Sequence, residues 1–293
     1  MPIWSYDWGV RKALSIGILT LLIFAGIVLP QDQVWVCPMD PDVRSSVAGV
    51  CPRCGMKLAA NLPEATEYHM DLSTLPRTLK PGQPAQLIFA IHDPWKARPV
   101  TNFQLVHEKL FHMFVISQDL EFFVHDHPVF EPDATFRYDN LRLPKAGMYR
   151  VLGDFYPDGA TPQLIAKTMI VPGTPPAPVH LSRDYSAKDA ANLQVEFRTE
   201  PPQAIAGLKT QLHFTIKPAD GFEKYLGAWG HMLAASEDLI DLIHTHPFIA
   251  DGGPNVQFDL TFPRPGNYRV WVQFQRKGVV NTAHFDIPVQ ELQ

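Results

Sequence analysis

The strongest constraint on the fold is an internal repeat, because two copies of one sequence pattern are expected to adopt one topology. LEFFVHDHP at 120–128 corresponds to LIDLIHTHP at 239–247, at a separation of 119 positions. Upstream, PGQPAQLIFAI at 81–91 matches AGLKTQLHFTI at 206–216 at a separation of 125, so the first copy is six residues longer before its histidines. The proline-rich segment 171–180 lies between the copies and is typical of a linker.

Each copy is rich in short apolar segments bounded by turn residues. Runs of Val, Ile, Phe and Tyr lie between Pro, Gly and Asp, while long amphipathic helix patterns are scarce. The sequence therefore predicts a mainly β chain with two tandem antiparallel β-sandwich (immunoglobulin-like) domains at 65–172 and 185–290. A small Cys-rich metal module at 34–60 precedes them, after a cytoplasmic stub and transmembrane anchor at 1–30.

The N-terminal segment predicts a transmembrane helix that is retained as an anchor. Residues 13–29 carry no charge, and this length is about the minimum for a bilayer span. Arg11 and Lys12 precede it, so the positive-inside rule predicts that the bulk of the chain is extracytoplasmic, either periplasmic or at the cell surface. A cleaved signal peptide is the alternative; the long apolar run and the lack of a clean small-x-small cleavage site disfavour it.

Three histidines recur at the same spacing in both copies. With a two-residue hairpin turn at 118–119, His112 would lie directly opposite His125, and His127 would be diagonal to His112 on the same face. The same turn in the second copy places one trio on one face of its hairpin, namely His231, His244 and His246. A different loop length would change the register, although each His-x-His pair shares a face in any register.

Three neutral imidazoles around one point suit Cu(II), Zn(II) or Ni(II). The alternative is that these are hydrogen-bonded strand residues without a ligand, and two matching trios in one chain favour the metal interpretation. Met113 and Met232 are expected on the opposite face, in the core, while His69 and His107 are auxiliary candidates. Neither repeat contains a Ser or Cys partner for a histidine that would indicate nucleophilic catalysis, so no enzymatic activity is expected.

All three cysteines of the chain lie in one short stretch. Cys51 and Cys54 have the spacing of a metal knuckle, and Cys37 offers a third thiolate. A Cys51–Cys54 disulfide with Cys37 free is one alternative, and a reactive redox thiol is another. A metal site is favoured because an odd number of cysteines leaves one thiol unpaired in an oxidising compartment. The fourth ligand is left open among Asp40, Met39 and Met56.

The segments VWVCPMDPDV (34–43) and GVCPRCGMKL (49–58) resemble the small heavy-metal-binding domain of copper-transporting ATPases and of periplasmic adaptor subunits of copper/silver efflux systems. The resemblance implies that the three cysteines are metal ligands. The histidine of that family's Cys-Pro-Met-His motif is Asp40 in this chain, a harder ligand that is less suited to Cu(I) and more tolerable for Zn(II). The repeats are similar to secreted bacterial immunoglobulin-like sandwiches of the YtkA-like type.

These patterns together predict a membrane-anchored, extracytoplasmic heavy-metal-binding protein for metal sequestration, transfer or resistance. Its expected ion is copper, as Cu(I) or Cu(II), or zinc. The alternative is an interaction or adaptor protein of a metal-efflux or respiratory membrane complex with structural histidines; a copper redox enzyme is a third interpretation. Net charge is −5 and no basic stripe is present, so no nucleic-acid partner is expected.

Overall fold

The computed structural model describes residues 34–40, 43–60, 66–96, 98–248 and 250–293, and within these ranges the regular elements are β-strands. The predicted anchor at 1–30 lies outside the described residues. No helix in the described ranges has the length and hydrophobicity of a membrane span.

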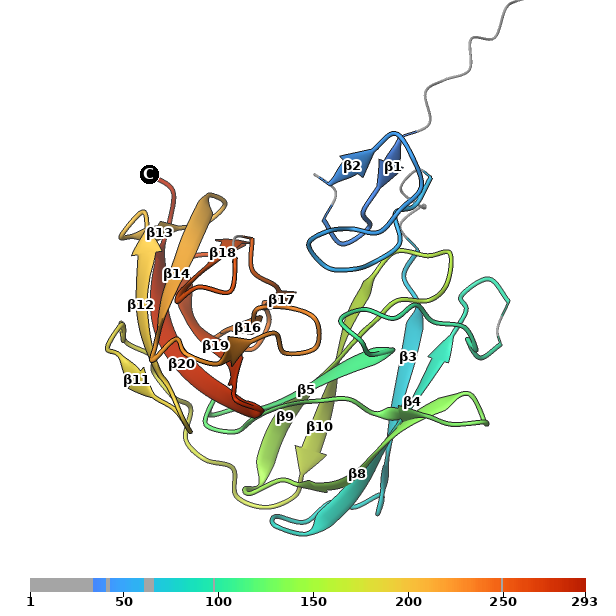
Figure 1. Ribbon diagram of the computed structural model, residues 1–293. Helices are drawn as coiled ribbons and strands as arrows, with labels where there is room; N and C mark the ends of the chain where they lie inside the picture. The colour runs from blue at the N-terminus through green and yellow to red at the C-terminus, as the bar shows by residue number, and fades with distance from the viewer. Residues whose placement is uncertain (1–33, 41–42, 61–65, 97, 249) are drawn as a thin grey trace, which may run out of the picture. The chain divides into compact units, whose positions relative to one another are not determined.

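The Cys-rich module is a small knuckle built on a two-stranded sheet (Figure 1). Strand β1 (Trp35–Val36) pairs antiparallel with β2 (Arg44–Ser45). The Cys51 amide donates to the Met56 carbonyl at 2.7 Å, and the Gly55 amide donates to the Cys51 carbonyl at 2.9 Å. Gly55 adopts a φ of 77°, a conformation that favours glycine and lets the chain turn tightly after the Cys-x-x-Cys pair.

The first repeat forms two sheets, with strand orders β3-β4-β8-β7 and β10-β9-β5-β6. The alternating burial along β4 places Leu87, Phe89 and Ile91 in the core between these sheets. The strand bounds are β3 (His69–Leu75), β4 (Pro84–His92), β5 (Phe111–Ser117), β6 (Phe123–Asp126), β7 (Val129–Phe130), β8 (Thr135–Arg142), β9 (Gly147–Phe155) and β10 (Gln163–Val171).

The second repeat has matching sheets, with orders β11-β12-β14-β18 and β13-β20-β19-β16-β17. The order β20-β19-β16-β17 reproduces β10-β9-β5-β6, which confirms the predicted sandwich-like repeat. The bounds are β11 (Lys188–Asp189), β12 (Gln194–Glu200), β13 (Ala204–Ile205), β14 (Lys209–Lys217), β15 (Phe222–Glu223), β16 (His231–Ser236), β17 (Leu242–Thr245), β18 (Asn255–Thr261), β19 (Gly266–Arg276) and β20 (Val279–Gln290).

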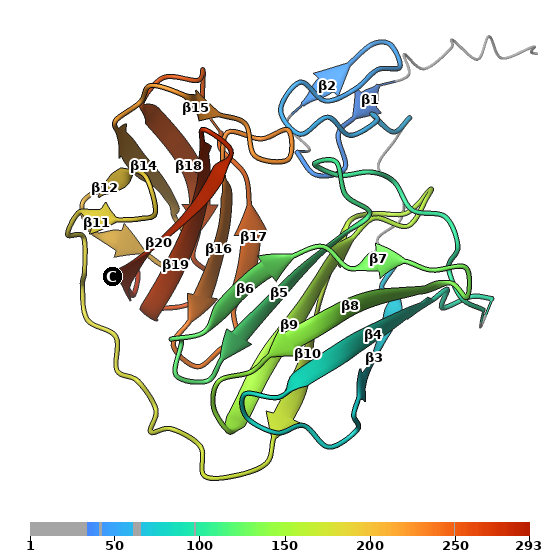
Figure 2. The ribbon, with the colours of Figure 1, turned by 60° about the horizontal axis from the view of Figure 1, so that its bottom comes forward.

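The histidine-bearing strands β5 and β16 are buried along their whole length, because each has a core on both faces. Met113 and Met232 point into the cores of their own sandwiches. On the other face, Phe114 packs with Leu233 and Trp271 in an apolar cluster shared by the two repeats. The β5–β6 and β16–β17 hairpins therefore meet at an interface between the repeats (Figure 2).

The predicted two-residue hairpin turn is wrong. Residues 118–121 form a longer loop, closed by the Ser117 amide donating to the Phe122 carbonyl at 3.1 Å, with Leu120 at a φ of 58°. His125 consequently pairs with Phe114, not with His112. The second hairpin has the same loop, and His244 pairs with Leu233.

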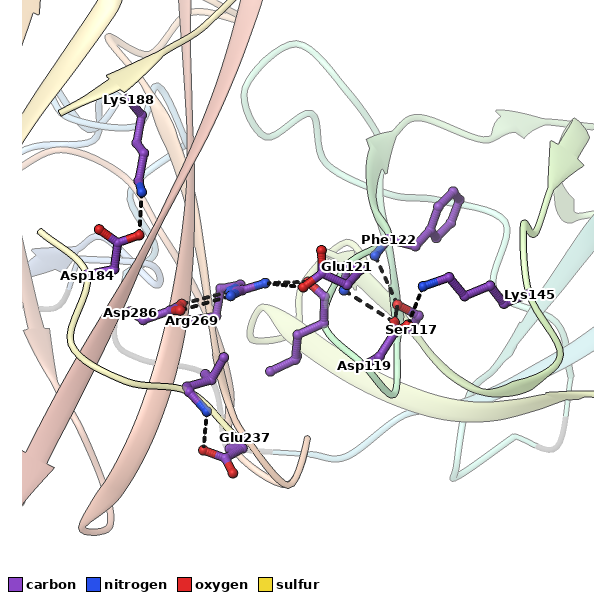
Figure 3. Close-up of polar contacts among 12 residues, drawn as sticks. Ser117, Asp119, Glu121, Phe122, Lys145, Asp184, Lys188, Glu237, Arg269 and Asp286 are labelled. Carbon is purple, nitrogen blue, oxygen red and sulfur yellow. Dashed lines mark hydrogen bonds and ion pairs between the residues drawn. The ribbon is translucent and has the colours of Figure 1, made fainter. Parts of the chain in front are cut away.

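Side-chain hydrogen bonds favour the longer loop. The Ser117 hydroxyl donates to Asp119, whose carboxylate also accepts from the Glu121 amide at 3.3 Å and from Lys145 at 2.7 Å (Figure 3). Because the register moved by two residues rather than one, every side chain kept its face. The trio therefore remains on one face, and the pairing register places His112 opposite position 127.

Candidate metal centres

The cysteine centre brings together Cys37, Asp40, Cys51 and Cys54, whose ligand atoms all lie within 4.8 Å of one another. The Sγ atoms of Cys37 and Cys54 are 3.5 Å apart, and Asp40 Oδ2 is 3.4 Å from Cys51 Sγ. A tetrahedral ion bound at about 2.3 Å by sulfur holds its ligand atoms roughly 3.5–3.8 Å apart. All three cysteines are buried free thiols, which contradicts the Cys51–Cys54 disulfide alternative.

Asp40 lies in the position of the fourth ligand, for which the sequence offered three alternatives. Its Oδ1 accepts a hydrogen bond from Arg53 at 3.0 Å, while Oδ2 faces the thiols of Cys37 and Cys51. Met56 is buried in the apolar cluster around the cysteines, and Met39 packs against that cluster. The two methionines therefore form part of the apolar surroundings of the centre.

Without an ion, the three thiols of the cysteine centre differ in how readily they lose a proton, and Cys37 loses its proton most readily. A hydrogen bond from the Cys54 thiol lowers the pKa of Cys37 to about 7. Burial raises the pKa of Cys51 to about 11, and the hydrogen bond to Cys37 together with burial raises the pKa of Cys54 above its usual range. Three adjacent thiolates repel one another, so Cys51 and Cys54 keep their protons until a cation replaces them.

We expect metal binding at this centre to release two protons above pH 7, one each from Cys51 and Cys54. The apparent affinity for Cu(I) or Zn(II) should then rise about 100-fold per pH unit between roughly pH 7 and 9. Competition titrations against a chromophoric chelator across this range measure the slope. A slope of about tenfold per pH unit or less would show that only one of the two thiols is a ligand.

The first histidine group consists of His112, His125 and His127. His112 Nδ1 lies 3.2 Å from His125 Nε2 and 3.2 Å from His127 Nε2. Neighbouring nitrogens of a tetrahedral site with bonds of about 2.0–2.1 Å are separated by roughly 3.3 Å. The nitrogens of these three rings thus have the spacing of ligands around one ion.

Hydrogen bonds on the outer side of two rings fix which nitrogen carries the proton. His112 Nε2 donates to the Val106 carbonyl at 2.9 Å, and His125 Nδ1 donates to Gln273 Oε1 at 2.6 Å. The Gln273 amide group donates to Thr282 at 3.0 Å, so its oxygen faces His125. His112 Nδ1 and His125 Nε2 therefore present lone pairs to each other, an arrangement that a cation between them stabilises.

The second group forms around His231, whose Nε2 donates to the Tyr225 carbonyl at 2.9 Å and whose Nδ1 lies 3.1 Å from His246 Nε2. The third member is His107, contributed by the first repeat. Its ring lies against that of His246, with centroids 3.7 Å apart. His244 lies next to this group, with its ring 4.6 Å from that of His246. The predicted second trio is therefore changed: His107 of the other repeat takes the place predicted for His244, whose Nδ1 bonds Asp154.

Burial keeps the rings of both groups neutral. It lowers the pKa of His112 to about 4 and those of His107 and His127 to about 3. The pKa values of His125 and His231 lie well below the ordinary histidine value for the same reason. Neutral imidazoles are the form that binds metal ions, so protons compete little with an ion near neutral pH.

Each repeat orients a histidine of the other. Asp154 on β9 accepts a hydrogen bond from His244 Nδ1 at 2.5 Å, and Gln273 on β19 holds His125. Asp154 and Gln273 are separated by the repeat distance of 119 positions, so the two contacts are equivalent. Neither residue was predicted from the sequence as part of the site. The sequence does contain a sign of their role, because each is a polar residue at the same position of an otherwise apolar strand in its repeat.

The fold and these sites define a mainly β protein with a cysteine-rich metal module and two sandwich repeats. The chain belongs to the family described as "Domain of unknown function (DUF8832)", whose model matches residues 63–171 and 188–291. Residues 34–61 match the model of the heavy metal binding domain, which confirms that part of the predicted resemblance. The resemblance of the repeats to the YtkA-like type stays a prediction. No curated protein matches the chain.

Three solved structures overlap with the chain at low TM-scores. The Yersinia pseudotuberculosis adhesin InvE has 11% identity and a TM-score of 0.25, covering 74% of this chain and 58% of the adhesin. The Escherichia coli adhesin FdeC has 13% identity, coverage of 80% and 70%, and a TM-score of 0.27. The Clostridium thermocellum CbhA fibronectin(III)-like modules have 10% identity, coverage of 76% and 95%, and a TM-score of 0.22. Overlaps at these TM-scores support no inference about function.

Proposed function

We propose that this chain binds copper as its cargo, for sequestration or transfer, at the outer face of a membrane to which its N-terminal segment anchors it. The observation that carries the proposal is the buried cluster of three thiols and one carboxylate at ligand spacing. Thiolates select soft ions such as Cu(I), and imidazoles also bind copper well. Zinc is the competing ion, because Asp40 completes a four-ligand set that suits it. The proposal assigns no catalytic step to the chain.

A cavity between the two kinds of centre supports a role in transfer. It has a volume of about 330 Å³, and its lining includes Asp40 of the cysteine centre and His246 of the second histidine group. Val106, whose carbonyl bonds His112, also packs in the apolar cluster around the cysteines. An ion that leaves the thiols through this cavity would meet the imidazole of His246 next.

Metal titration of the full chain tests the proposal. Purified wild type and a Cys37→Ser/Cys51→Ser/Cys54→Ser variant are titrated anaerobically with Cu(I) and with Zn(II) against chelators of known affinity. We expect the variant to lose its thiolate-bound Cu(I), detected as the loss of sulfur-to-copper charge-transfer absorption. Ser45→Ala is the matched control within the module, because among the hydrogen bonds of the described residues that hydroxyl bonds only the backbone of Val47. Wild type and variant binding Cu(I) equally would refute the thiol centre.

A further inference from the structure

The two histidine groups lie next to each other. The ring centroids of His125 and His231 are 5.4 Å apart, and those of His112 and His231 are 5.9 Å apart. The first repeat contributes His107 to the second group, so neither group belongs to an isolated domain. The seven rings form one buried cluster in the interface between β5–β6 and β16–β17: His107, His112, His125, His127, His231, His244 and His246.

Two nitrogens of this cluster are buried and lack a hydrogen-bond partner in the described part of the protein: His107 Nε2 and His244 Nε2. His107 is 5% exposed, and its protonated side is accounted for by a hydrogen bond to the backbone of Leu226. His244 Nδ1 donates to Asp154, so its Nε2 carries a lone pair. Buried polar atoms are rarely left unpaired, and two such lone pairs beside other imidazoles indicate a place where a cation binds.

We infer that the cluster is a single two-ion copper centre, with one Cu(I) held by His112, His125 and His127 and the other by His107, His231 and His246. This inference rests on the proposed function as a copper carrier. In this centre each repeat contributes residues to the site of the other. Gln273 of the second repeat orients His125, a ligand of the first ion, and His107 of the first repeat is a ligand of the second ion. Asp154 of the first repeat bonds His244, which lies between the two groups.

Charge favours Cu(I) over a divalent ion at this centre. At equal separation, two divalent ions repel each other about fourfold more strongly than two monovalent ions. Among the described residues, two carboxylates contact rings of the cluster: the buried Asp154, which accepts a hydrogen bond from His244, and Asp126, whose Oδ1 lies 3.7 Å from His127 Nδ1. Two negative charges equal the charge of two Cu(I) ions but balance only half of that of two Zn(II) ions. Three neutral imidazoles per ion also leave no anionic ligand to offset a second positive charge.

Stoichiometry separates this centre from the cysteine centre. The full chain carrying Cys37→Ser, Cys51→Ser and Cys54→Ser is titrated anaerobically with Cu(I), and bound copper is counted by native mass spectrometry. We expect two Cu(I) per chain and X-ray absorption with nitrogen but no sulfur scattering. His107→Asn should bind only one, and asparagine suits this position because residue 107 has a φ of 45°. His69→Ala, an exposed histidine of β3, is the matched control and should still bind two.

Each possible result supports or contradicts one part of the inference. One Cu(I) or none in the cysteine-free chain overturns the two-ion centre. The proposed function is tested separately, by the thiolate-bound Cu(I) that wild type holds and the cysteine-free variant lacks. Two Cu(I) retained in His107→Asn overturns the assignment of His107. Uptake of two Zn(II) with the same affinity as two Cu(I) overturns the charge argument. Circular dichroism of each variant, compared with wild type, shows whether a loss reflects unfolding; an unfolded His107→Asn is replaced by His231→Gln, for which the same loss of one ion is expected.

Discussion

Replacing Asp40 with alanine lowers the Zn(II) affinity of the cysteine centre roughly 100-fold, while the Cu(I) affinity changes by about threefold or less. The reason is coordination: Zn(II) in a closed site takes four ligands, and Cu(I) is held mainly by thiolates, of which Cys37, Cys51 and Cys54 remain. The Asp40 carboxylate oxygen lies 3.4 Å from Cys51 Sγ, so its removal deletes one ligand without touching the others. Chelator competition with each ion measures the two affinities.

Asp139→Ala is the control for this substitution, because Asp139 is an exposed carboxylate of β8 that bonds only Gln86 among the hydrogen bonds of the described residues. Its Zn(II) and Cu(I) affinities should match wild type. An unchanged Zn(II) affinity in Asp40→Ala would show that the aspartate is not a ligand. An equal loss for both ions would show that the substitution disrupts the module rather than removing one ligand.

Replacing Asp286 with alanine lowers the free energy of unfolding by about 3–5 kcal/mol. Arg269 and Asp286 form a buried two-bond ion pair, with distances of 2.7 and 2.8 Å, and their side chains are 8% and 9% exposed. The same guanidinium donates to the Leu120 carbonyl and to Glu121 in the first repeat (Figure 3). Removing Asp286 leaves the buried guanidinium with the longer ion pair to the exposed Glu121, at 3.2 Å, and weakens the contact between the repeats.

Denaturant unfolding followed by circular dichroism measures this loss. Glu196→Ala is the matched control, because Glu196 pairs with Lys217 on the exposed surface and its loss should cost less than about 1 kcal/mol. A change of less than about 1 kcal/mol for Asp286→Ala would mean that the pair is solvated in solution. The double variant Arg269→Met/Asp286→Leu should recover much of the stability, since it removes both buried charges.

The repeat and the alternation of side chains were predictable from the sequence, whereas the strand register was not. The hairpin loop length depends on side-chain hydrogen bonds such as those of Asp119, which a pattern of apolar residues does not encode. His112, His125 and His127 still share one face, because a shift of the register by two residues leaves each side chain on its original face of the strand. A one-residue change would have turned His112 away from His125 and His127.

The contact between the two histidine groups could not be predicted from the sequence either. A signal existed in β5, whose residues FHMFVIS are largely apolar on both faces, as expected for a strand buried on two sides. That pattern predicts a second layer against the outer face but does not say which segment supplies it. Only the folded chain shows that the layer is the other repeat, and that His107 and Asp154 reach across the interface.

The position of Asp40 illustrates a different limit. Its spacing from Cys37 matches the family pattern, yet the change from histidine left its role open. Local geometry decides it: Arg53 holds one carboxylate oxygen, and the other faces the thiols. A residue's ligand role therefore depends on what fixes its side chain, which sequence spacing alone does not reveal.

Anomalous diffraction at the copper edge, from crystals of the Cu(I)-loaded chain, tests the central claim of heavy-metal binding most directly. We expect one anomalous peak within bonding distance of Cys37, Cys51 and Cys54, at about 2.3 Å from sulfur. We expect two further peaks in the interface between the repeats, one in each histidine group. Loaded crystals with no peak among the three cysteines, and none among the histidines, would contradict it.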